Sequence, residues 1–248
     1  MSEQKILDLL KSNQLTKAKQ FIENLLKSEK ENITYIFYYG LILANERKFR
    51  DAINFFEKAL AADKDHYYSN FNIAGCYQGL LIFDKAIEYY ENCSKINTNK
   101  FEPYHQIGIC YKQLRKYEDS ISNLKKALKI SVNAKSFYML GNVYRENGQF
   151  EEAKVSFEKS IDINKEFTQS KLSLANLQID YENYERAERM LDEIIKSNES
   201  ESVLISAKIM IGNILKSKGD FEKAIKINQD ILEKDTNNVD ALYNISQC

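Results

Sequence analysis

One pattern recurs along the chain at a nearly constant spacing. Each copy begins with a turn, usually followed by an aromatic residue, then a small residue three positions later and an apolar stripe, as in GQFEEAKVSFEKSIDIN at residues 148–164. The separations between the small residues are 34, 34, 34, 33, 34 and 37 positions, and the residues are Ala18, Ala52, Ala86, Ser120, Ala153, Ala187 and Ala224. Such self-similarity is typical of a repeat architecture, in which no single central core is needed.

Each copy contains two apolar blocks with three- and four-residue steps, which predicts two amphipathic helices. A second set of small residues stands twelve positions before the first set in six copies: Gly40, Ala74, Gly108, Gly141, Ala175 and Gly212. A small residue at these places lets two helices cross closely, and one such helix pair would be Tyr39, Gly40 and Leu43 with Ala52, Phe56 and Ala59. The turn between the blocks is short, so the two helices should be antiparallel. One pair cannot bury its apolar face alone, so successive pairs must stack.

The composition favours helices and excludes some classes of partner. The 248 residues include 8 Gly and 1 Pro, which is few for a fold built on turns. The 35 basic and 36 acidic residues leave a net charge of -1, so we expect no nucleic-acid or membrane partner. The longest apolar run, residues 35–44, is about half as long as a membrane span.

The cysteines lack the spacing of a metal site. They are Cys76, Cys93, Cys110 and Cys248. Cys76 and Cys110 occupy the same place in adjacent copies, where stacking should hold them too far apart for a disulfide. We therefore expect reduced thiols and a cytoplasmic location.

At these residues the chain resembles the tetratricopeptide repeat family, whose period is also 34. The small-large-small signature appears, for example, as Gly108, Tyr111, Ser120, Leu124 and Ala127. The resemblance implies an all-α fold: a right-handed superhelical solenoid of antiparallel helix pairs. The family's usual Trp and boundary Pro are absent.

Two copies depart from the pattern at single positions. Lys5 occupies an apolar position of the first copy, which we interpret as an N-terminal cap. Asn228 replaces a large apolar residue in the seventh copy, so the second helix there is expected to pack less firmly.

The period predicts the division of the chain. Residues 1–32 form a degenerate capping repeat, and residues 239–248 begin an eighth repeat, where we expect the array to be truncated. Six repeats lie between them, at residues 33–66, 67–100, 101–133, 134–167, 168–204 and 205–238. Three extra residues at the sixth boundary predict a longer polar loop over residues 196–202.

The sequence carries no recognisable catalytic set. His66 and His105 are the only histidines, and neither has a nucleophile signature near it. Phosphate-binding glycine loops are absent, and the acidic pairs open exposed helices. We therefore expect no catalytic residue, metal or cofactor in this segment, and interpret His105 as a groove contact.

In the tetratricopeptide repeat family the first helix of each repeat lines a concave groove. The resemblance thus implies a set of partner-binding residues: Phe37, Tyr68, Phe71, His105, Lys112, Tyr138, Asn142, Arg145, Asn176, Asn213 and Lys216. The early part of this groove is aromatic and apolar, and the later part is rich in amides with some basic residues.

Each part of the groove has a structural alternative. Phe37 and Phe71 could instead pack between neighbouring helices. Asn142, Asn176 and Asn213 stand at one phase of three consecutive repeats, where a column of amides would hydrogen-bond an extended peptide backbone. The alternative is that Asn is simply frequent in this chain. A chaperone-tail clamp is disfavoured, because the frames that start at Asn142 and Asn176 lack the required cations.

The leading hypothesis is a non-catalytic scaffold or adaptor that binds a peptide or helix of a partner protein in the groove. The alternative is the N-terminal substrate-recognition arm of a larger enzyme, a glycosyltransferase, sulfotransferase or oxygenase, whose catalytic domain lies beyond residue 248. A third hypothesis is self-association through an exposed C-terminal end, where Leu242 and Ile245 would leave apolar surface uncovered.

Overall fold

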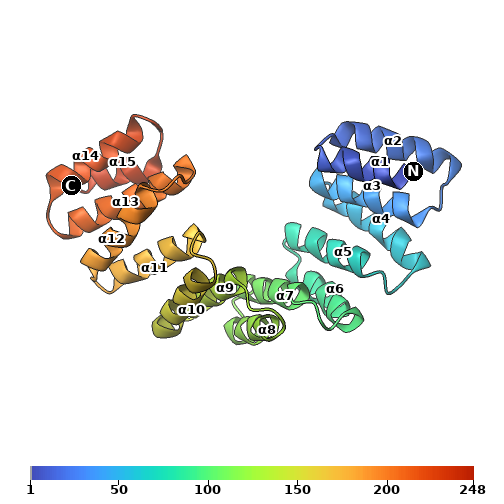
Figure 1. The fold of residues 1–248 in the computed structure, drawn as a ribbon, viewed down its shortest axis with the longest axis horizontal. Helices are drawn as coiled ribbons and strands as arrows, with labels where there is room; N and C mark the ends of the chain where they lie inside the picture. Colours follow the sequence, from blue (N-terminus) through green and yellow to red (C-terminus); the bar gives the residue numbers. More distant parts are fainter. Residues whose placement is uncertain (1) are drawn as a thin grey trace. The chain divides into compact units, whose positions relative to one another are not determined.

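The computed structural model describes residues 2–248, and α-helices are the regular secondary structure throughout this range (Figure 1). The described chain divides into an N-terminal unit, Met1–Val132, and a C-terminal unit, Asn133–Cys248. The helices of the N-terminal unit are α1 (Ser2–Lys11), α2 (Leu15–Ser28), α3 (Ile33–Asn45), α4 (Phe49–Ala62), α5 (Tyr67–Gly79), α6 (Phe83–Ile96), α7 (Glu102–Gln113) and α8 (Tyr117–Ile130). Those of the C-terminal unit are α9 (Ala134–Glu146), α10 (Phe150–Ile163), α11 (Thr168–Asp180), α12 (Tyr184–Ile195), α13 (Glu201–Ser217), α14 (Phe221–Leu232) and α15 (Val239–Ser246). The predicted all-α fold class is confirmed.

Capping side chains start several of the odd-numbered helices. Asn32, Asn133 and Asn238 each accept a hydrogen bond from a backbone N–H of the first turn that follows. Nδ1 of His66 does the same for the N–H of Ser69 at the start of α5. These bonds satisfy donors that a helix N-terminus leaves free, so each helix begins at a defined residue.

The turn inside each helix pair contains one residue with positive φ. These residues recur with the period of the sequence: Asn13, Arg47, Leu81, Arg115, Gly148, Glu182 and Gly219. In the second pair, Arg47 N–H donates to Ala44 O and Lys48 N–H donates to Leu43 O, which are the two bonds of a Schellman motif. The motif ends the first helix sharply and returns the chain as an antiparallel neighbour.

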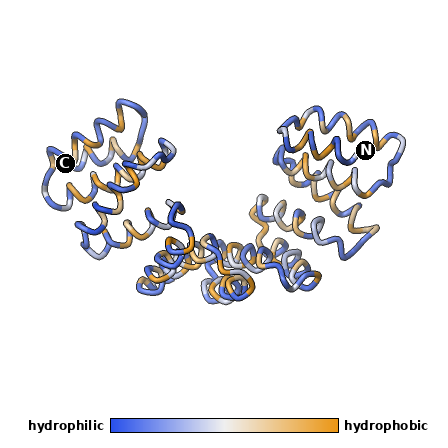
Figure 2. The backbone as a smooth tube through the Cα atoms, in the orientation of Figure 1, coloured by the Kyte–Doolittle hydropathy of each residue, from blue (hydrophilic) through white to orange (hydrophobic). Residues whose placement is uncertain are grey.

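The predicted close crossing within a pair is confirmed. A Cβ atom on Gly40 would lie 2.7 Å from the Phe56 ring, and one on Gly141 would lie 2.6 Å from the ring of Phe157. No larger residue fits there without displacing the ring. Figure 2 shows hydrophobic and hydrophilic stretches alternating along the helices, as expected when each helix buries one stripe.

The second helix of a pair also packs against the first helix of the next pair within each unit. In the N-terminal unit Phe56 of α4 shares a buried cluster with Ile73 and Cys76 of α5. In the C-terminal unit Leu191 of α12 shares one with Ile214 of α13. Stacking of this kind buries both sides of most helices, which is how a solenoid replaces a central core.

The longer loop expected over residues 196–202 is wrong in part. Helix α12 ends at Ile195 and α13 begins at Glu201, so the connection is residues 196–200, no longer than the connection at residues 97–101. The extra residues instead lengthen α13 to 17 residues, against 13 in α9 and α11. Ser200, with extended backbone angles, lies directly before the helix as its N-cap residue.

The irregular positions have local explanations. Lys5 remains exposed, with Nζ 4.4 Å from the centroid of the Phe21 ring, so its ammonium group lies on an apolar surface without being buried. Residues 239–246 do form a helix, but its buried residues are Ala241 and Asn244, whereas Leu242 is 49 % exposed. Cys76, Cys93 and Cys110 are buried free thiols, and Cys248 is an exposed one. Over residues 2–248, every helix is too short or too polar to cross a bilayer.

Candidate functional site

The three asparagines predicted to form a column lie on neighbouring helices of the C-terminal unit. Helix α11 contacts both α9 and α13, and these helices carry Asn176, Asn142 and Asn213 respectively. Asn176 and Asn213 are partly exposed, and Asn142 is 9 % exposed. The three amides are therefore presented by one layer of helices.

Within residues 2–248 the side-chain amides of Asn142, Asn176 and Asn213 have no hydrogen-bond partner. The buried unpartnered side-chain atoms of the described chain are Asn228 Oδ1 and Asn244 Nδ2, so the Asn142 amide contacts solvent even though most of its side chain is covered. An open amide at the edge of water can exchange its water for a ligand at little cost.

The asparagines of α5 behave differently. Nδ2 of Asn70 donates to the carbonyls of Lys64 and His66, and Nδ2 of Asn72 donates to Tyr68 O. These two amides are therefore occupied by hydrogen bonds within the protein. The high frequency of Asn in the chain therefore does not explain why the three amides of the column in the C-terminal unit lack a partner.

The remaining candidates of the C-terminal unit are also half-buried. The Tyr138 ring lies 5.4 Å from the Phe167 ring and 6.2 Å from the Phe157 ring, measured between centroids. Arg145 and Lys216 stand in the last turns of α9 and α13, where a cation suits the helix dipole. The amide column is thus accompanied by one aromatic and two basic side chains on the same helices.

In the N-terminal unit the structure brings Phe37 and Tyr68 together through His66. The ring centroids of Phe37 and His66 are 5.3 Å apart, and those of His66 and Tyr68 are 6.3 Å apart. These three residues belong to the wall of a pocket of about 190 Å³. Its described lining is Glu3, Ile33, Thr34, Phe37, Tyr38, His66 and Tyr68, and we call it the aromatic pocket.

Phe71 has mainly a packing role. Its ring stacks on Tyr67 at 6.0 Å and meets the Tyr90 ring edge-on at 5.1 Å, and Tyr90 is fully buried. Phe37 likewise contacts the buried Phe56 at 5.6 Å, although one part of its ring faces the aromatic pocket. The structural alternative therefore accounts for Phe71, and its role in partner binding stays a prediction.

His105 and Lys112 lie one above the other on α7, both half-buried. The His105 ring is 6.5 Å from the Phe101 ring. Neither residue joins the aromatic pocket or the amide column. Their place in a binding surface stays a prediction.

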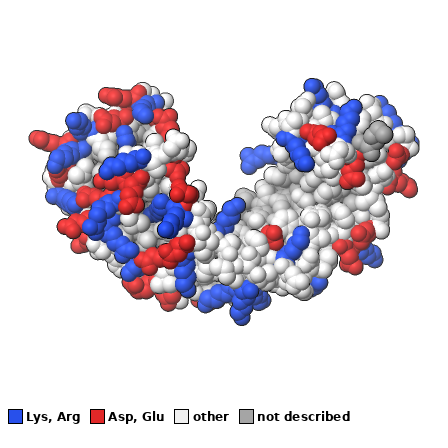
Figure 3. All heavy atoms as spheres, in the orientation of Figure 1, with Lys and Arg blue, Asp and Glu red and all other residues white. Residues whose placement is uncertain are grey.

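Three cysteines of the N-terminal unit are buried and keep their protons. Burial raises the pKa of Cys76 to about 11 and the pKa values of Cys93 and Cys110 to about 12, so these thiols remain protonated and unreactive at neutral pH. Among residues 2–248 no group of three or more His, Cys, Asp or Glu side chains is arranged to hold a metal ion. Figure 3 shows charged side chains widely spaced over α5 and α7 and denser over α11–α14 on the face drawn.

The sequence did not identify Glu3, Tyr38 and His66 as members of one pocket. From the sequence, His66 is considered only as a catalytic residue, and no nucleophile signature lies near it. A recognisable signal is its position directly before a helix with Ser69 three residues later, which is the spacing of an N-cap. Glu3 gave no signal, because its place beside α3 depends on how the first helices pack.

Comparison with protein-family models identifies the repeats. Models of the tetratricopeptide repeat match residues 134–167 and 205–232. The chain belongs to the tetratricopeptide repeat family. A model described as subunit 3 of the anaphase-promoting complex, or cyclosome, matches residues 45–127 of this tetratricopeptide repeat protein. The individual repeat boundaries stay predictions.

Solved structures show the same fold at low sequence identity. A tetratricopeptide repeat protein from Parabacteroides merdae is 17% identical, with a TM-score of 0.74 over 99% of this chain and 96% of that one. PilF from Pseudomonas aeruginosa is 17% identical, with a TM-score of 0.71 over 87% and 97% of the two chains. A chain of the APC/C hetero-tetramer Cut9-Hcn1 is 16% identical, with a TM-score of 0.72 over 98% of this chain and 47% of that chain. No curated protein sequence is significantly similar to this tetratricopeptide repeat protein.

Proposed function

We propose that this tetratricopeptide repeat protein is a non-catalytic adaptor that holds an extended segment of a partner protein along α9, α11 and α13. The observation that carries the proposal is the set of three unpartnered amides, Asn142, Asn176 and Asn213, on adjacent helices. The fold supports a protein-interaction role in general, and the amide column supports binding along these three helices.

The chemistry of the amide suits a peptide backbone. Each asparagine side chain offers both a donor and an acceptor, and so does each backbone peptide group. Axes of helices in contact are about 8–10 Å apart, which is about three residues of an extended strand. Neighbouring asparagines would therefore meet every third residue of the bound segment, independently of its side chains.

The flanking side chains would supply selectivity. Tyr138 offers a ring and a hydroxyl group from the second turn of α9, and aromatic side chains are frequent binding anchors. Arg145 and Lys216 favour acidic side chains in the bound segment. We expect affinity from the backbone contacts and a modest preference for acidic and apolar residues.

The comparisons support the class of function without naming a partner. The subunit 3 model and the hetero-tetramer structure both come from a multi-protein assembly, as their descriptions say. We extend the proposal to a cytoplasmic location, since Cys76, Cys93, Cys110 and Cys248 are all free thiols.

The test is a display selection of random peptides on the native protein, followed by binding measurements on the triple variant Asn142→Ala, Asn176→Ala and Asn213→Ala. We expect the selected peptides to bind the triple variant at least about tenfold more weakly, because three hydrogen bonds of about 0.5–1.5 kcal/mol each are lost. Helicity by circular dichroism should not change. The matched control is Asn198→Ala with Asn237→Ala, two exposed asparagines outside α9, α11 and α13. Equal affinity of the triple variant and the control would refute the amide column.

A further inference from the structure

The aromatic pocket of the N-terminal unit has walls of four rings and one carboxylate. It lies where α3 contacts α1 and α5, so three helices contribute to it. The Phe37 ring is inclined by 61° to Tyr38 and by 81° to His66, and His66 is inclined by 64° to Tyr68. Rings at such steep angles meet edge to face and do not stack flat against one another.

We propose that the aromatic pocket binds a cationic side chain, arginine or lysine, of a partner protein. The faces of aromatic rings carry negative charge density, which attracts a cation within about 6 Å. Of the described residues that line the pocket, Glu3 alone carries a formal charge when His66 is neutral. The pocket therefore presents one full negative charge and several partial ones to a ligand.

Glu3 is positioned to receive that ligand. Its Oε1 accepts a hydrogen bond of 3.3 Å from the Tyr38 hydroxyl group, which leaves most of the acceptor capacity of the carboxylate open. Burial and the adjacent Glu3 raise the pKa of Tyr38, so its phenol stays neutral and continues to donate. A guanidinium or ammonium group in the pocket would complete a charge-assisted hydrogen bond to Glu3.

The chain already holds one cation against Tyr68, a ring of the aromatic pocket. Lys100 Nζ lies 4.3 Å from the Tyr67 centroid and 5.0 Å from the Tyr68 centroid. Tyr67 and Tyr68 are the first two residues of α5, where the helix dipole by itself favours an anion. His66 caps that turn by accepting the Ser69 N–H, and Asn32 caps α3 in the same way. A cation is thus accommodated over the ring faces at this edge of the unit.

Lys100 offers a way to test the proposal, because its ammonium group and the bound cation would both contact the Tyr68 ring. A guest cation is attracted by Glu3 and repelled by Lys100, whereas a guest anion would respond in the opposite sense. Charge-removing variants at these two residues thus report the sign of the ligand. The proposal does not depend on the amide column, which belongs to the C-terminal unit.

The experiment is a nuclear magnetic resonance titration of the full chain with N-acetyl-L-arginine amide and N-acetyl-L-lysine amide. N-acetyl-L-citrulline amide is the neutral control and N-acetyl-L-glutamate amide the anionic one. We expect both cationic probes to shift the ring signals of Phe37, Tyr38, His66 and Tyr68. Citrulline should bind about tenfold or more weakly, because it keeps the shape of arginine without the charge.

Variants identify the residues responsible. Glu3→Gln and Tyr68→Leu should each weaken arginine binding about two- to fivefold, and Lys100→Gln should strengthen it. Tyr68 is 55 % exposed, so its replacement leaves the core intact. The matched controls are Glu185→Gln and Tyr243→Leu, which are exposed residues of the C-terminal unit. Equal binding of arginine and citrulline, preference for glutamate, or weaker arginine binding in Lys100→Gln would each overturn the proposal.

Discussion

The side chain of Asn228 lies directly against Gly212, with Nδ2 2.8 Å from the place where a Cβ atom would stand on that glycine. The same contact in other pairs is made by large apolar residues, such as Leu124 against Gly108. Asn228 is fully buried; its Nδ2 donates to Ala224 O at 2.7 Å, and its Oδ1 has no partner within the described residues. The expected weak point of the seventh pair is therefore a buried acceptor without a donor.

Replacing this residue should stabilise the C-terminal unit. Asn228→Leu removes the unpaired oxygen, a burial cost of about 1–3 kcal/mol, and restores the apolar contact seen at Leu124. We expect a higher midpoint in urea unfolding, followed by circular dichroism. The control Asn198→Leu, at an exposed loop position, should leave the midpoint nearly unchanged. A lower midpoint for Asn228→Leu would mean that the hydrogen bond to Ala224 matters more than the orphaned oxygen.

Two helix glycines should respond to alanine with opposite signs. At Gly141 the new methyl group would meet the Phe157 ring at 2.6 Å, so Gly141→Ala should destabilise by about 1–3 kcal/mol through overpacking. At Gly75 the nearest atom is the Tyr90 hydroxyl oxygen at 3.8 Å, so Gly75→Ala should stabilise by up to about 1 kcal/mol through helix propensity. Chemical unfolding of the two variants tests the pair. The same sign for both would show that the close crossing is not what selects glycine.

The helix pairs could be predicted from the period and the residue classes of the repeat. The side-chain contacts between pairs could not be predicted. Gly40 opposite Phe56 follows from the recurring small and large positions, because helix crossing demands them wherever the repeat occurs. Glu3 and Tyr38 share no repeated position, yet they meet because α1 happens to lie against α3. Asn142, Asn176 and Asn213 were identified by phase alone, and only the structure shows that they lack the internal hydrogen bonds that Asn70 and Asn72 make.

Replacing Leu81 with glycine should stabilise the turn between α5 and α6. Leu81 has φ 61° and is 73 % exposed, so it contributes almost no packing while holding a left-handed conformation that costs about 1–2 kcal/mol. Glycine removes that strain at an entropic cost of about 0.5–1 kcal/mol, so Leu81→Gly should raise the melting temperature slightly. Ile82→Gly, where φ is -96°, is the control and should lower it. A fall for Leu81→Gly would show that its side chain contributes unrecognised contacts.

Thiol reactivity should report the folding of the N-terminal unit. Cys76, Cys93 and Cys110 are buried with raised pKa values, whereas Cys248 is exposed. An aromatic disulfide reagent at neutral pH should therefore modify one thiol per chain quickly and three only on unfolding. Cys248→Ser should abolish the fast phase. Rapid modification of a second thiol in native buffer would mean that the N-terminal unit opens locally more often than its packing implies.

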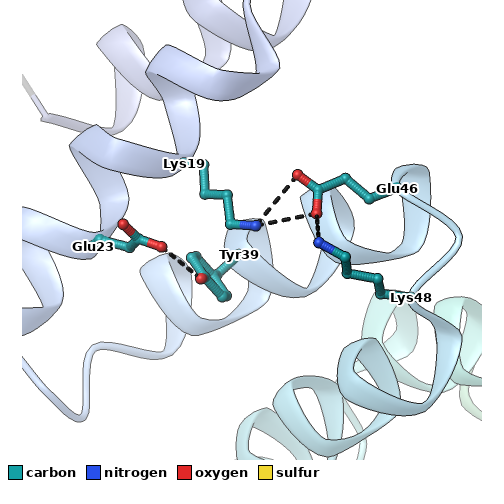
Figure 4. A network of polar contacts seen from close by, with 5 residues as sticks. All are labelled: Lys19, Glu23, Tyr39, Glu46 and Lys48. Carbon is teal, nitrogen blue, oxygen red and sulfur yellow. Dashed lines mark hydrogen bonds and ion pairs between the residues drawn. The ribbon is translucent and has the colours of Figure 1, made fainter.

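A polar network on the N-terminal unit should make the free energy of unfolding depend on pH above 10. The Tyr39 hydroxyl group donates to Glu23 Oε1 at 2.7 Å. Nearby, the Glu46 carboxylate binds Lys19 and Lys48 at 3.1 and 2.7 Å, as the dashed lines of Figure 4 indicate. Burial first, and then Glu23, raise the pKa of Tyr39 from 10.0 to about 12. The folded state therefore favours the neutral phenol.

The sign of the effect follows from that shift. Below pH 10 the phenol is neutral in both states and its contribution to stability is fully present; it is lost as the pH rises towards 12, because the unfolded chain releases the proton first. Tyr39→Phe should flatten the fall in unfolding free energy between these pH values and remove one late step from the ultraviolet titration of tyrosinate. Tyr243→Phe, an exposed tyrosine of the C-terminal unit, is the control. If Tyr39→Phe leaves both curves unchanged, the hydrogen bond to Glu23 does not persist in solution.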